Sequence, residues 1–232
     1  MDLVAVMPGL YLLRMGIGQA YLWHEHDALT LIDSGMPGSA PEIAGAIGSL
    51  GFSPADVRTV VVTHAHEDHY GSVPDIMTWG DAEILVGRAD AGVVRGHAPE
   101  QRPVREEMPP WELELYDSLP PMPSIGPGRV DRELDDGDVI DFGGGAEVIH
   151  IPGHTAGSIA LHLPAHRLLF SGDTVANVGG QTMLGVFNSD RAGACRSFAR
   201  LAELDLGLVL VGHGDPLAGE ASARLRDVAA TL

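Results

Sequence analysis

The first part of the chain is a series of short apolar runs separated by glycine and polar residues. Residues 10–14, 20–24 and 29–33 are such runs, and their length and spacing predict the strands of an antiparallel meander. Residues 39–50 instead repeat apolar side chains three and four positions apart, which is the spacing of one helix face. Ser39 can cap the start of this helix, and Gly51 can end it.

Strands and helices then alternate. A β-branched strand over residues 57–63 leads to a helix that we expect to run through Trp79, and a strand over 83–86 precedes a short helix over 89–95. A second sheet is predicted from the runs at 133–134, 139–142, 146–151, 158–163 and 168–170. A helix ending at Leu206, a last strand over 208–211 and an amphipathic helix over 221–231 complete the chain.

This order of elements predicts one α/β domain. Two mixed β-sheets face each other with helices on the outer faces, in a four-layer αβ/βα sandwich. A chain of 232 residues, of which 45% are hydrophobic, is long enough for one such domain, and no long linker interrupts it. We therefore expect residues 1–232 to form a single domain.

The segment over residues 96–129 departs from this pattern. It is rich in proline, and it carries apolar and aromatic side chains without a helical or strand period. We expect a loop that orders against the body of the protein and forms a lid or pocket wall. The residues that would line this pocket are Met108, Trp111, Tyr116 and Met122. A surface excursion without a function remains the alternative.

The charge of the chain restricts its partners. The net charge is -18, with 32 acidic residues against 14 basic ones, and every basic residue is arginine. Such a surface repels phosphate backbones, so we expect no nucleic-acid partner. The absence of lysine excludes Schiff-base chemistry.

The remaining compositional features concern compartment. Cys195 is the single cysteine, so no intramolecular disulfide can form. The N-terminus has no basic region followed by an apolar core, and no apolar run reaches the length of a membrane span. We expect a cytoplasmic protein without a membrane partner. The composition does not predict an oligomeric state.

One stretch concentrates the polar chemistry of the chain. The strand over 57–63 runs into Thr63-His64-Ala65-His66-Glu67-Asp68-His69-Tyr70-Gly71. His64 and His66 are two positions apart and face one side of an extended segment, whereas Asp68 and His69 follow where the backbone must bend. Imidazole and carboxylate are the ligands that borderline divalent cations such as zinc prefer. The stretch therefore predicts a metal site.

This stretch resembles the His-x-His-x-Asp-His signature of the metallo-β-lactamase superfamily. Other pieces of the family pattern follow in order along nearly the whole chain: Ile32-Asp33-Ser34-Gly35, Pro152-Gly153-His154-Thr155-Ala156-Gly157-Ser158, Ser171-Gly172-Asp173-Thr174 and Gly212-His213-Gly214. The resemblance implies the same αβ/βα fold. It is specific for the fold and the metal site but not for the substrate, because one core serves many reactions.

The resemblance also assigns the ligands. His64, His66 and His154 would hold a first metal ion, Asp68, His69 and His213 a second, and Asp173 would bridge the two. We expect two divalent ions, with zinc preferred and iron or manganese as alternatives. Asp33 would support the metal loop by hydrogen bonding. Thr63, Thr155 and Ser158 could do the same from beside the ligands, although a role in forming turns explains them equally well.

The implied function is a metal-dependent hydrolase. A hydroxide that bridges the two ions would attack the carbonyl of an ester, thioester, lactone or amide, including β-lactams, and Asp68 would accept or relay a proton. The partner is then a small molecule with a carbonyl centre. Two alternatives stay open: an oxidoreductase similar to persulfide dioxygenases with one iron, and a non-catalytic interaction protein stabilised by metal.

Overall fold

The computed structural model describes all 232 residues, which divide into two compact units. The first unit comprises Met1–Pro99, Pro123–Leu134 and Asp141–Gly143, and the second comprises Glu100–Met122, Asp135–Ile140 and Gly144–Leu232. Each unit is built on one large mixed sheet. None of the helices combines the length and apolar composition that a membrane span requires.

The sheet of the first unit has seven strands in sequence order. The first four form an antiparallel meander, of which the second to the fourth strands were predicted, and the fourth to the seventh are parallel. The strands are β1 (Asp2–Met7), β2 (Leu10–Arg14), β3 (Gln19–Glu25), β4 (Ala28–Ile32), β5 (Val57–Val62), β6 (Glu83–Gly87) and β7 (Arg132–Leu134). Because β4, β5 and β6 are parallel, the residues that follow them emerge at the same edge of the sheet.

Two strands of this sheet differ from the prediction. β1 was not predicted at all. The pairing of residues 133–134 with the second sheet was wrong, because they belong to β7, which pairs with β6 through Leu85 and Arg132. This pairing joins segments far apart in the sequence, and the pattern of apolar residues carries no information on which sheet a short strand completes.

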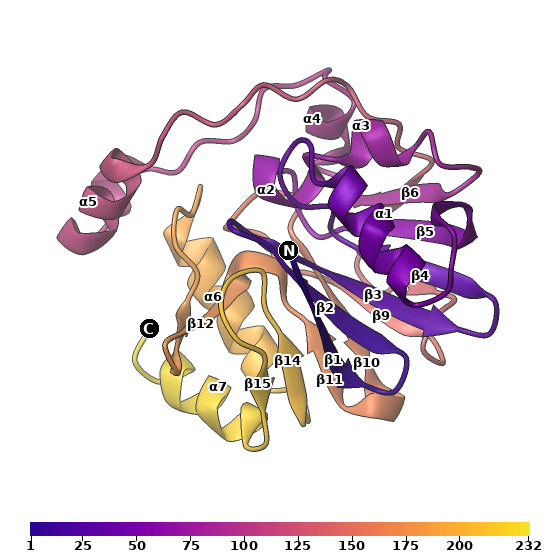
Figure 1. Cartoon of the computed structure of the whole chain (residues 1–232). Coiled ribbons are helices and arrows are strands. Elements are labelled where there is room, and N and C mark those ends of the chain that lie inside the picture. Colours follow the sequence, from indigo (N-terminus) through magenta and orange to yellow (C-terminus); the bar gives the residue numbers. More distant parts are fainter. The chain divides into compact units, whose positions relative to one another are not determined.

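Short helices cover one face of the first sheet. Helix α1 (Ala40–Ser49) buries Ile43 and Ile47 against Leu31 and Val60, and Figure 1 shows it lying along the strands. Gly51 ends it with a φ of 87°, as predicted. Ser39 takes the N-cap position, but its side chain makes no capping hydrogen bond. The remaining helices are α2 (Glu67–Tyr70), α3 (Val73–Ile76) and α4 (Ala91–Val94).

The expected continuous helix through Trp79 is wrong. Two short helices, α2 and α3, take its place. A Cβ at Gly71 would overlap the Glu67 carbonyl oxygen, so the chain packs too closely here for any other residue. Pro74, in the first turn of α3, has no N–H to donate to a preceding turn, which separates the two helices.

The sheet of the second unit has six strands. Their spatial order is β15-β14-β11-β10-β9-β8, and only β11 and β14 are parallel neighbours. The strands are β8 (Val139–Ile140), β9 (Ala146–His150), β10 (Ile159–Leu163), β11 (Leu168–Phe170), β14 (Leu208–Leu210) and β15 (Leu217–Ala218). Since β9, β11 and β14 all run in one direction, their carboxyl ends share an edge.

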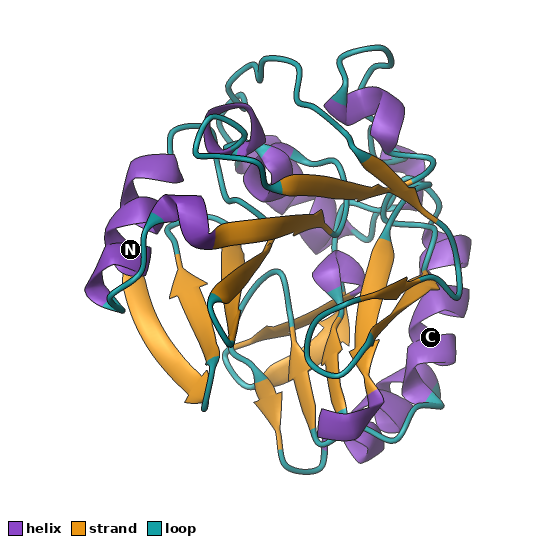
Figure 2. Cartoon of the chain, turned by 90° about the vertical axis from the view of Figure 1, so that its right-hand side faces the viewer, coloured by secondary structure: helices purple, strands orange, loops and turns teal.

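Two helices pack on this sheet. Phe198 and Leu201 of α6 (Arg191–Ala202) and Leu225 of α7 (Ala221–Ala229) share an apolar core with Leu169 and Val209 of the strands. Figure 2 shows these purple helices beside the strands near the C-terminus. A small separate hairpin, β12 (Val175–Val178) and β13 (Gln181–Leu184), was not predicted.

The proline-rich segment contains a helix that the sequence did not predict. Helix α5 (Pro110–Ser118) lies in the second unit. Its Glu112 is only 1% exposed and accepts hydrogen bonds from the Phe187 N–H at 2.6 Å and the Arg191 guanidinium at 3.0 Å. The middle of the segment, Glu100–Met122, is therefore ordered as part of the second unit, whereas its two ends belong to the first. Its role as a lid or pocket wall stays a prediction, as does the organisation of the chain as a single domain.

Candidate metal centre

The first unit gathers four potential ligands where β5 ends. His64, Asp68 and His69 are buried and His66 is half-buried. The rings of His64 and His69 lie 4.0 Å apart between centroids, and those of His64 and His66 lie 4.8 Å apart. Asp68 Oδ2 is 3.5 Å from His69 Nε2. Three imidazoles and a carboxylate thus converge within a segment of six residues.

Asp33 organises this cluster from the end of β4. Its carboxylate is 3% exposed and accepts three hydrogen bonds: from the Thr63 N–H at 2.7 Å, the Thr63 hydroxyl at 2.8 Å and His69 Nδ1 at 2.8 Å. The first two bonds hold the backbone where the histidine stretch begins, and the third holds the His69 ring. Asp33 has a φ of 61°, a left-handed conformation rarely adopted by residues other than glycine.

These bonds also set which ring nitrogens can bind a cation. His69 Nδ1 carries the proton that Asp33 accepts, so Nε2 presents its lone pair. The Thr63 hydroxyl gives its proton to Asp33 and is 3.0 Å from His64 Nδ1, from which it can accept. His64 Nε2 is then likewise available. Both imidazoles are therefore oriented to present Nε2, the nitrogen that a metal ion would bind.

Sequence reasoning missed two supports of this cluster. Asp90, at the start of α4, is completely buried and accepts a hydrogen bond from the Ala65 N–H at 2.8 Å, so it fixes the backbone between His64 and His66. Gly18, between β2 and β3, has a φ of 65°, and a Cβ there would lie 2.7 Å from the Asp68 carbonyl oxygen. An aspartate in the short loop between a buried strand and the next helix is a signal that could have identified Asp90.

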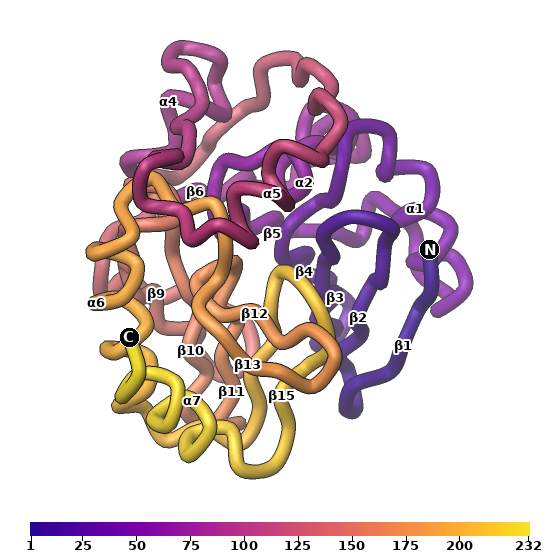
Figure 3. The backbone as a smooth tube through the Cα atoms, turned by 90° about the vertical axis from the view of Figure 1, so that its left-hand side faces the viewer, coloured from indigo at the N-terminus to yellow at the C-terminus, as the bar shows by residue number.

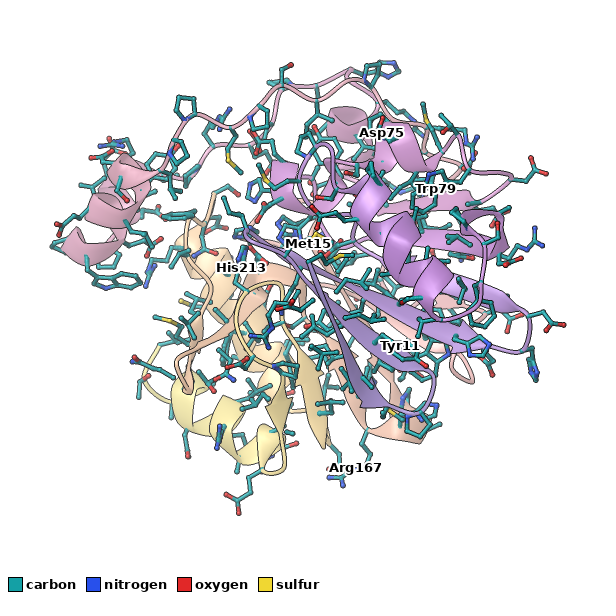
Figure 4. The ribbon with its side chains drawn as sticks, viewed as in Figure 1. Tyr11, Met15, Asp75, Trp79, Arg167 and His213 are labelled. Atoms are coloured by element: carbon teal, nitrogen blue, oxygen red, sulfur yellow. The ribbon has the colours of Figure 1, made fainter.

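The second unit gathers three further ligands at the shared edge of β9, β11 and β14. Asp173 Oδ2 lies 3.1 Å from His213 Nε2 and 3.6 Å from His154 Nε2. Figure 4 labels His213, which follows β14. Two ligands of one tetrahedral zinc, each about 2.0–2.1 Å from the ion, lie about 3.4 Å apart. The distances from Asp173 to both histidines match this spacing.

The loop that carries His154 is held by its neighbours. Ser189 donates its N–H to the His154 carbonyl oxygen at 3.1 Å, and its hydroxyl donates to the Gly153 carbonyl oxygen at 3.2 Å. Thr155 and Ser158 bond to each other, with 2.8 Å between the two hydroxyl oxygens and 3.0 Å from the Thr155 N–H to Ser158 Oγ. The sequence left two roles open for this pair, support of the metal ligands and formation of a turn. These bonds are typical of turn-forming residues.

The four predicted pocket residues all lie between positions 108 and 122, in the second unit, but their surroundings differ. Tyr116 packs against Phe187, with ring centroids 5.3 Å apart, and the Arg105 guanidinium lies over its ring. Trp111 leaves 49% of its surface exposed. Met108 and Met122 are half-buried. Whether these four residues line a substrate pocket stays a prediction.

The residues present fit divalent metal ions. Imidazole nitrogens and carboxylate oxygens are the donors that zinc and its neighbours in the first transition row bind. At least two of the imidazoles have their second nitrogen engaged by a hydrogen bond, which is the usual support of a metal-bound histidine.

Comparison with known proteins agrees with this chemistry. The model of the metallo-β-lactamase superfamily matches residues 13–213. The acyl-coenzyme A thioesterase MBLAC2 of Gallus gallus is 34% identical over 84% of this chain and 72% of its own length. A hydroxyacylglutathione hydrolase of Aeromonas hydrophila is 31% identical over 83% of this chain, which spans 60% of that enzyme.

Solved structures show the same fold. A metallo-β-lactamase from Cronobacter sakazakii, solved as a mutant of its HARLDQ motif, aligns with a TM-score of 0.70 and 26% identity, covering 91% of this chain and 80% of its own. The two mixed sheets, their helices and the order of the histidine and aspartate motifs all follow the family pattern. The chain is therefore a member of the metallo-β-lactamase superfamily, a superfamily of metal-dependent hydrolases.

Proposed function

We propose that this protein is a thioester hydrolase with a dinuclear metal centre. The observation that carries the proposal is the position of Asp173, whose carboxylate lies within 3.6 Å of both His154 and His213. A carboxylate placed between two histidines that belong to different metal ions is what a bridging ligand requires. The names of two relatives, a thioesterase and a hydroxyacylglutathione hydrolase, favour thioesters within the wider hydrolase class.

The family pattern assigns the seven candidate ligands to two metal ions. His64, His66 and His154 would hold the first ion, Asp68, His69 and His213 the second, and Asp173 would touch both. Zinc is the metal that this set of nitrogen and oxygen donors suits best, since all the ligands are imidazole or carboxylate. When bound, two such ions lower the pKa of a shared water towards 7 and polarise a carbonyl.

The residues of the chain supply orientation and proton transfer. Asp33 and Thr63 fix His64 and His69 in the tautomers that present Nε2. Asp173 lies at a distance from each histidine that suits sharing one ion with His154 and the other with His213. We retain for Asp68 the role of accepting or relaying the proton that water loses as the acyl carbon–sulfur bond breaks. The products are a carboxylic acid and a thiol.

The charge of the protein bears on the substrate. With a net charge of -18 and no lysine, the surface opposes nucleic acids, so a small acyl thioester is the proposed partner. The acyl part is expected to meet the segment that carries Trp111 and Tyr116. These side chains are aromatic and amphipathic, which suits an apolar acyl group better than a phosphate.

A panel of substrates tests the proposal. The zinc-loaded protein is offered acetyl- and octanoyl-coenzyme A, a hydroxyacylglutathione, a lactone and a β-lactam, and thiol release or ring opening is followed by absorbance. We expect the thioesters to have the highest kcat/KM and a chelator to abolish their turnover. If only the lactone or the β-lactam were hydrolysed, the substrate would not be a thioester. Turnover that persists in the presence of a chelator would contradict a metal-dependent mechanism.

A further inference from the structure

The hairpin of β12 and β13 directly follows Asp173, the proposed bridging ligand. It also lies against the loop that carries His213, another proposed ligand. Asp173 precedes β12, and His213 follows β14. Figure 3 shows the hairpin alongside the yellow part of the chain. Asn177 of β12 forms a parallel bridge with Gly214 that belongs to neither large sheet. The hairpin therefore connects the loops of two ligands that are 40 residues apart in the sequence, at positions 173 and 213.

Asn177 makes this connection through both its backbone and its side chain. Its N–H donates to the His213 carbonyl oxygen at 3.3 Å, and its carbonyl oxygen accepts from the Asp215 N–H at 2.8 Å. Its Nδ2 donates to the Asp215 carbonyl oxygen at 2.8 Å. The residues on both sides of Gly214 are thus bonded to one asparagine, which is only 4% exposed.

The amide of Asn177 is itself held in place. Thr182, its partner across the hairpin, donates its hydroxyl to Asn177 Oδ1 at 3.1 Å. The two contacts assign the amide, because Oδ1 faces a hydroxyl donor and Nδ2 faces a carbonyl acceptor. An aspartate at this position would keep the first bond but would turn an oxygen towards the Asp215 carbonyl oxygen.

Two glycines allow the close packing that these bonds need. Gly214 has a φ of 99°, and a Cβ there would overlap the Asn177 carbonyl oxygen. At the other end of the hairpin, Gly185 donates its N–H to the Thr174 carbonyl oxygen at 3.1 Å, and a Cβ there would overlap the Asp173 carbonyl oxygen. The hairpin is therefore seated against the backbone of both ligands.

We infer that Asn177 is a positioning residue that sets His213 relative to Asp173 and so tunes the second metal ion. The inference rests on the dinuclear centre proposed above. His213 is 36% exposed at its side chain and follows a glycine, so packing alone does not fix it. The bonds from Asn177 restrain the backbone on both sides of Gly214. His154 is supported instead by Ser189, so the first ion is independent of Asn177.

Zinc titration of the chelator-treated protein tests this role. The variants are Asn177→Asp, Asn177→Ala and Thr182→Val, and each is titrated with zinc in competition with a chromophoric chelator. We expect the first equivalent to bind as in the wild type and the Kd of the second to rise about 10–100-fold in the Asn177 variants, the usual cost of losing an outer support of a ligand. Thr182→Val should also raise the Kd of the second zinc ion, but by a smaller factor.

Ser222→Ala is the matched control. Ser222 is another buried polar residue of the second unit, and its hydroxyl bonds to the backbone of Leu204 and Leu206 at the far end of β14. It should lower the melting temperature without changing either zinc affinity. An Asn177 variant that keeps the wild-type second site, or loses both sites together, would overturn the inference and leave the proposed function standing. A wild type with a single site would overturn both.

Discussion

Asp33 Oδ2 accepts a hydrogen bond from His69 Nδ1 at 2.8 Å, across 36 positions of the sequence. The same carboxylate also holds the backbone and hydroxyl of Thr63. One buried aspartate at the end of β4 thus supports the histidine stretch after β5 at two points. The parallel pairing of β4 with β5 makes this possible, because it brings the two strand ends to the same edge.

Replacing Asp33 by asparagine should weaken both stability and metal binding. Asparagine has one acceptor oxygen where three donors converge, so at least one buried donor loses its partner, at a cost of about 1–3 kcal/mol. We expect zinc affinity to fall about 10–100-fold as His69 loses its orientation. Urea unfolding and zinc titration measure the two effects. Asp205→Asn, on an exposed aspartate, is the control, and an equal loss in both variants would contradict the role of Asp33.

Replacing Asp173 by alanine should remove both metal ions and nearly all activity. Asp173 alone would touch both ions, whereas the sheets carry their own apolar cores. Elemental analysis after dialysis should find less than one ion per chain, and circular dichroism should show an unchanged fold. A variant that retains two ions would refute the bridging role of Asp173.

Replacing Trp111 by alanine should affect long acyl substrates selectively. Trp111 is half exposed on α5, so the fold does not depend on it as it does on the buried, hydrogen-bonded Glu112. We expect kcat/KM to fall several-fold for octanoyl-coenzyme A and little for acetyl-coenzyme A, with unchanged metal content.

Tyr116→Ala provides the comparison for this prediction. Tyr116 packs against Phe187, so its removal should also lower the melting temperature. If Trp111→Ala changed both substrates equally, or neither, α5 would not form the pocket wall.

Acid should weaken an ion pair that joins α6 to the strand region of the second unit. Arg200 donates two hydrogen bonds to Asp136 and lowers the pKa of that carboxyl group below its ordinary value, with smaller contributions from His150. A lowered pKa stabilises the folded state above the ordinary carboxyl pKa, and this contribution is lost as the pH falls through the lowered value.

Asp136→Asn measures this contribution. The pair is largely exposed, so the variant should lose only about 0–1 kcal/mol at pH 7. The difference in melting temperature between wild type and variant should shrink as the pH falls below the ordinary pKa of a carboxyl group and vanish below the lowered pKa of Asp136. A difference that persists unchanged at low pH would show that the pair acts through packing and not through charge.

The sequence predicted the elements that have a strong local pattern. The apolar runs of β2 to β6 and the periodic face of α1 are local features, and the structure confirms them. The hairpin of β12 and β13 also has a local signal in the sequence, the pair Gly179-Gly180. Both glycines have positive φ values, as two-residue hairpin turns require. Helix α5 lacked such a signal, since prolines surround it and its docking depends on Glu112 meeting Phe187 and Arg191.

The candidate site likewise contains residues that the sequence identifies and residues that it does not. The histidine and aspartate ligands lie in short motifs at strand ends, so their residue types and spacing identify them. Their supports do not lie in motifs. Asp90 reaches Ala65 from 25 positions away, and Asn177 reaches Asp215 from 38. Such contacts depend on which strands become neighbours in the folded protein, and the local pattern of residues does not specify this pairing.

The metal content of the protein tests the central claim most directly. Protein purified without chelator and without added metal is analysed for zinc, iron and manganese, and the ions are counted per chain. The account predicts about two divalent ions per chain, chiefly zinc, from seven ligands and a bridging carboxylate. A content fixed at one iron per chain would contradict it and point to oxygen chemistry, and no bound metal would leave the proposed hydrolase without its chemistry.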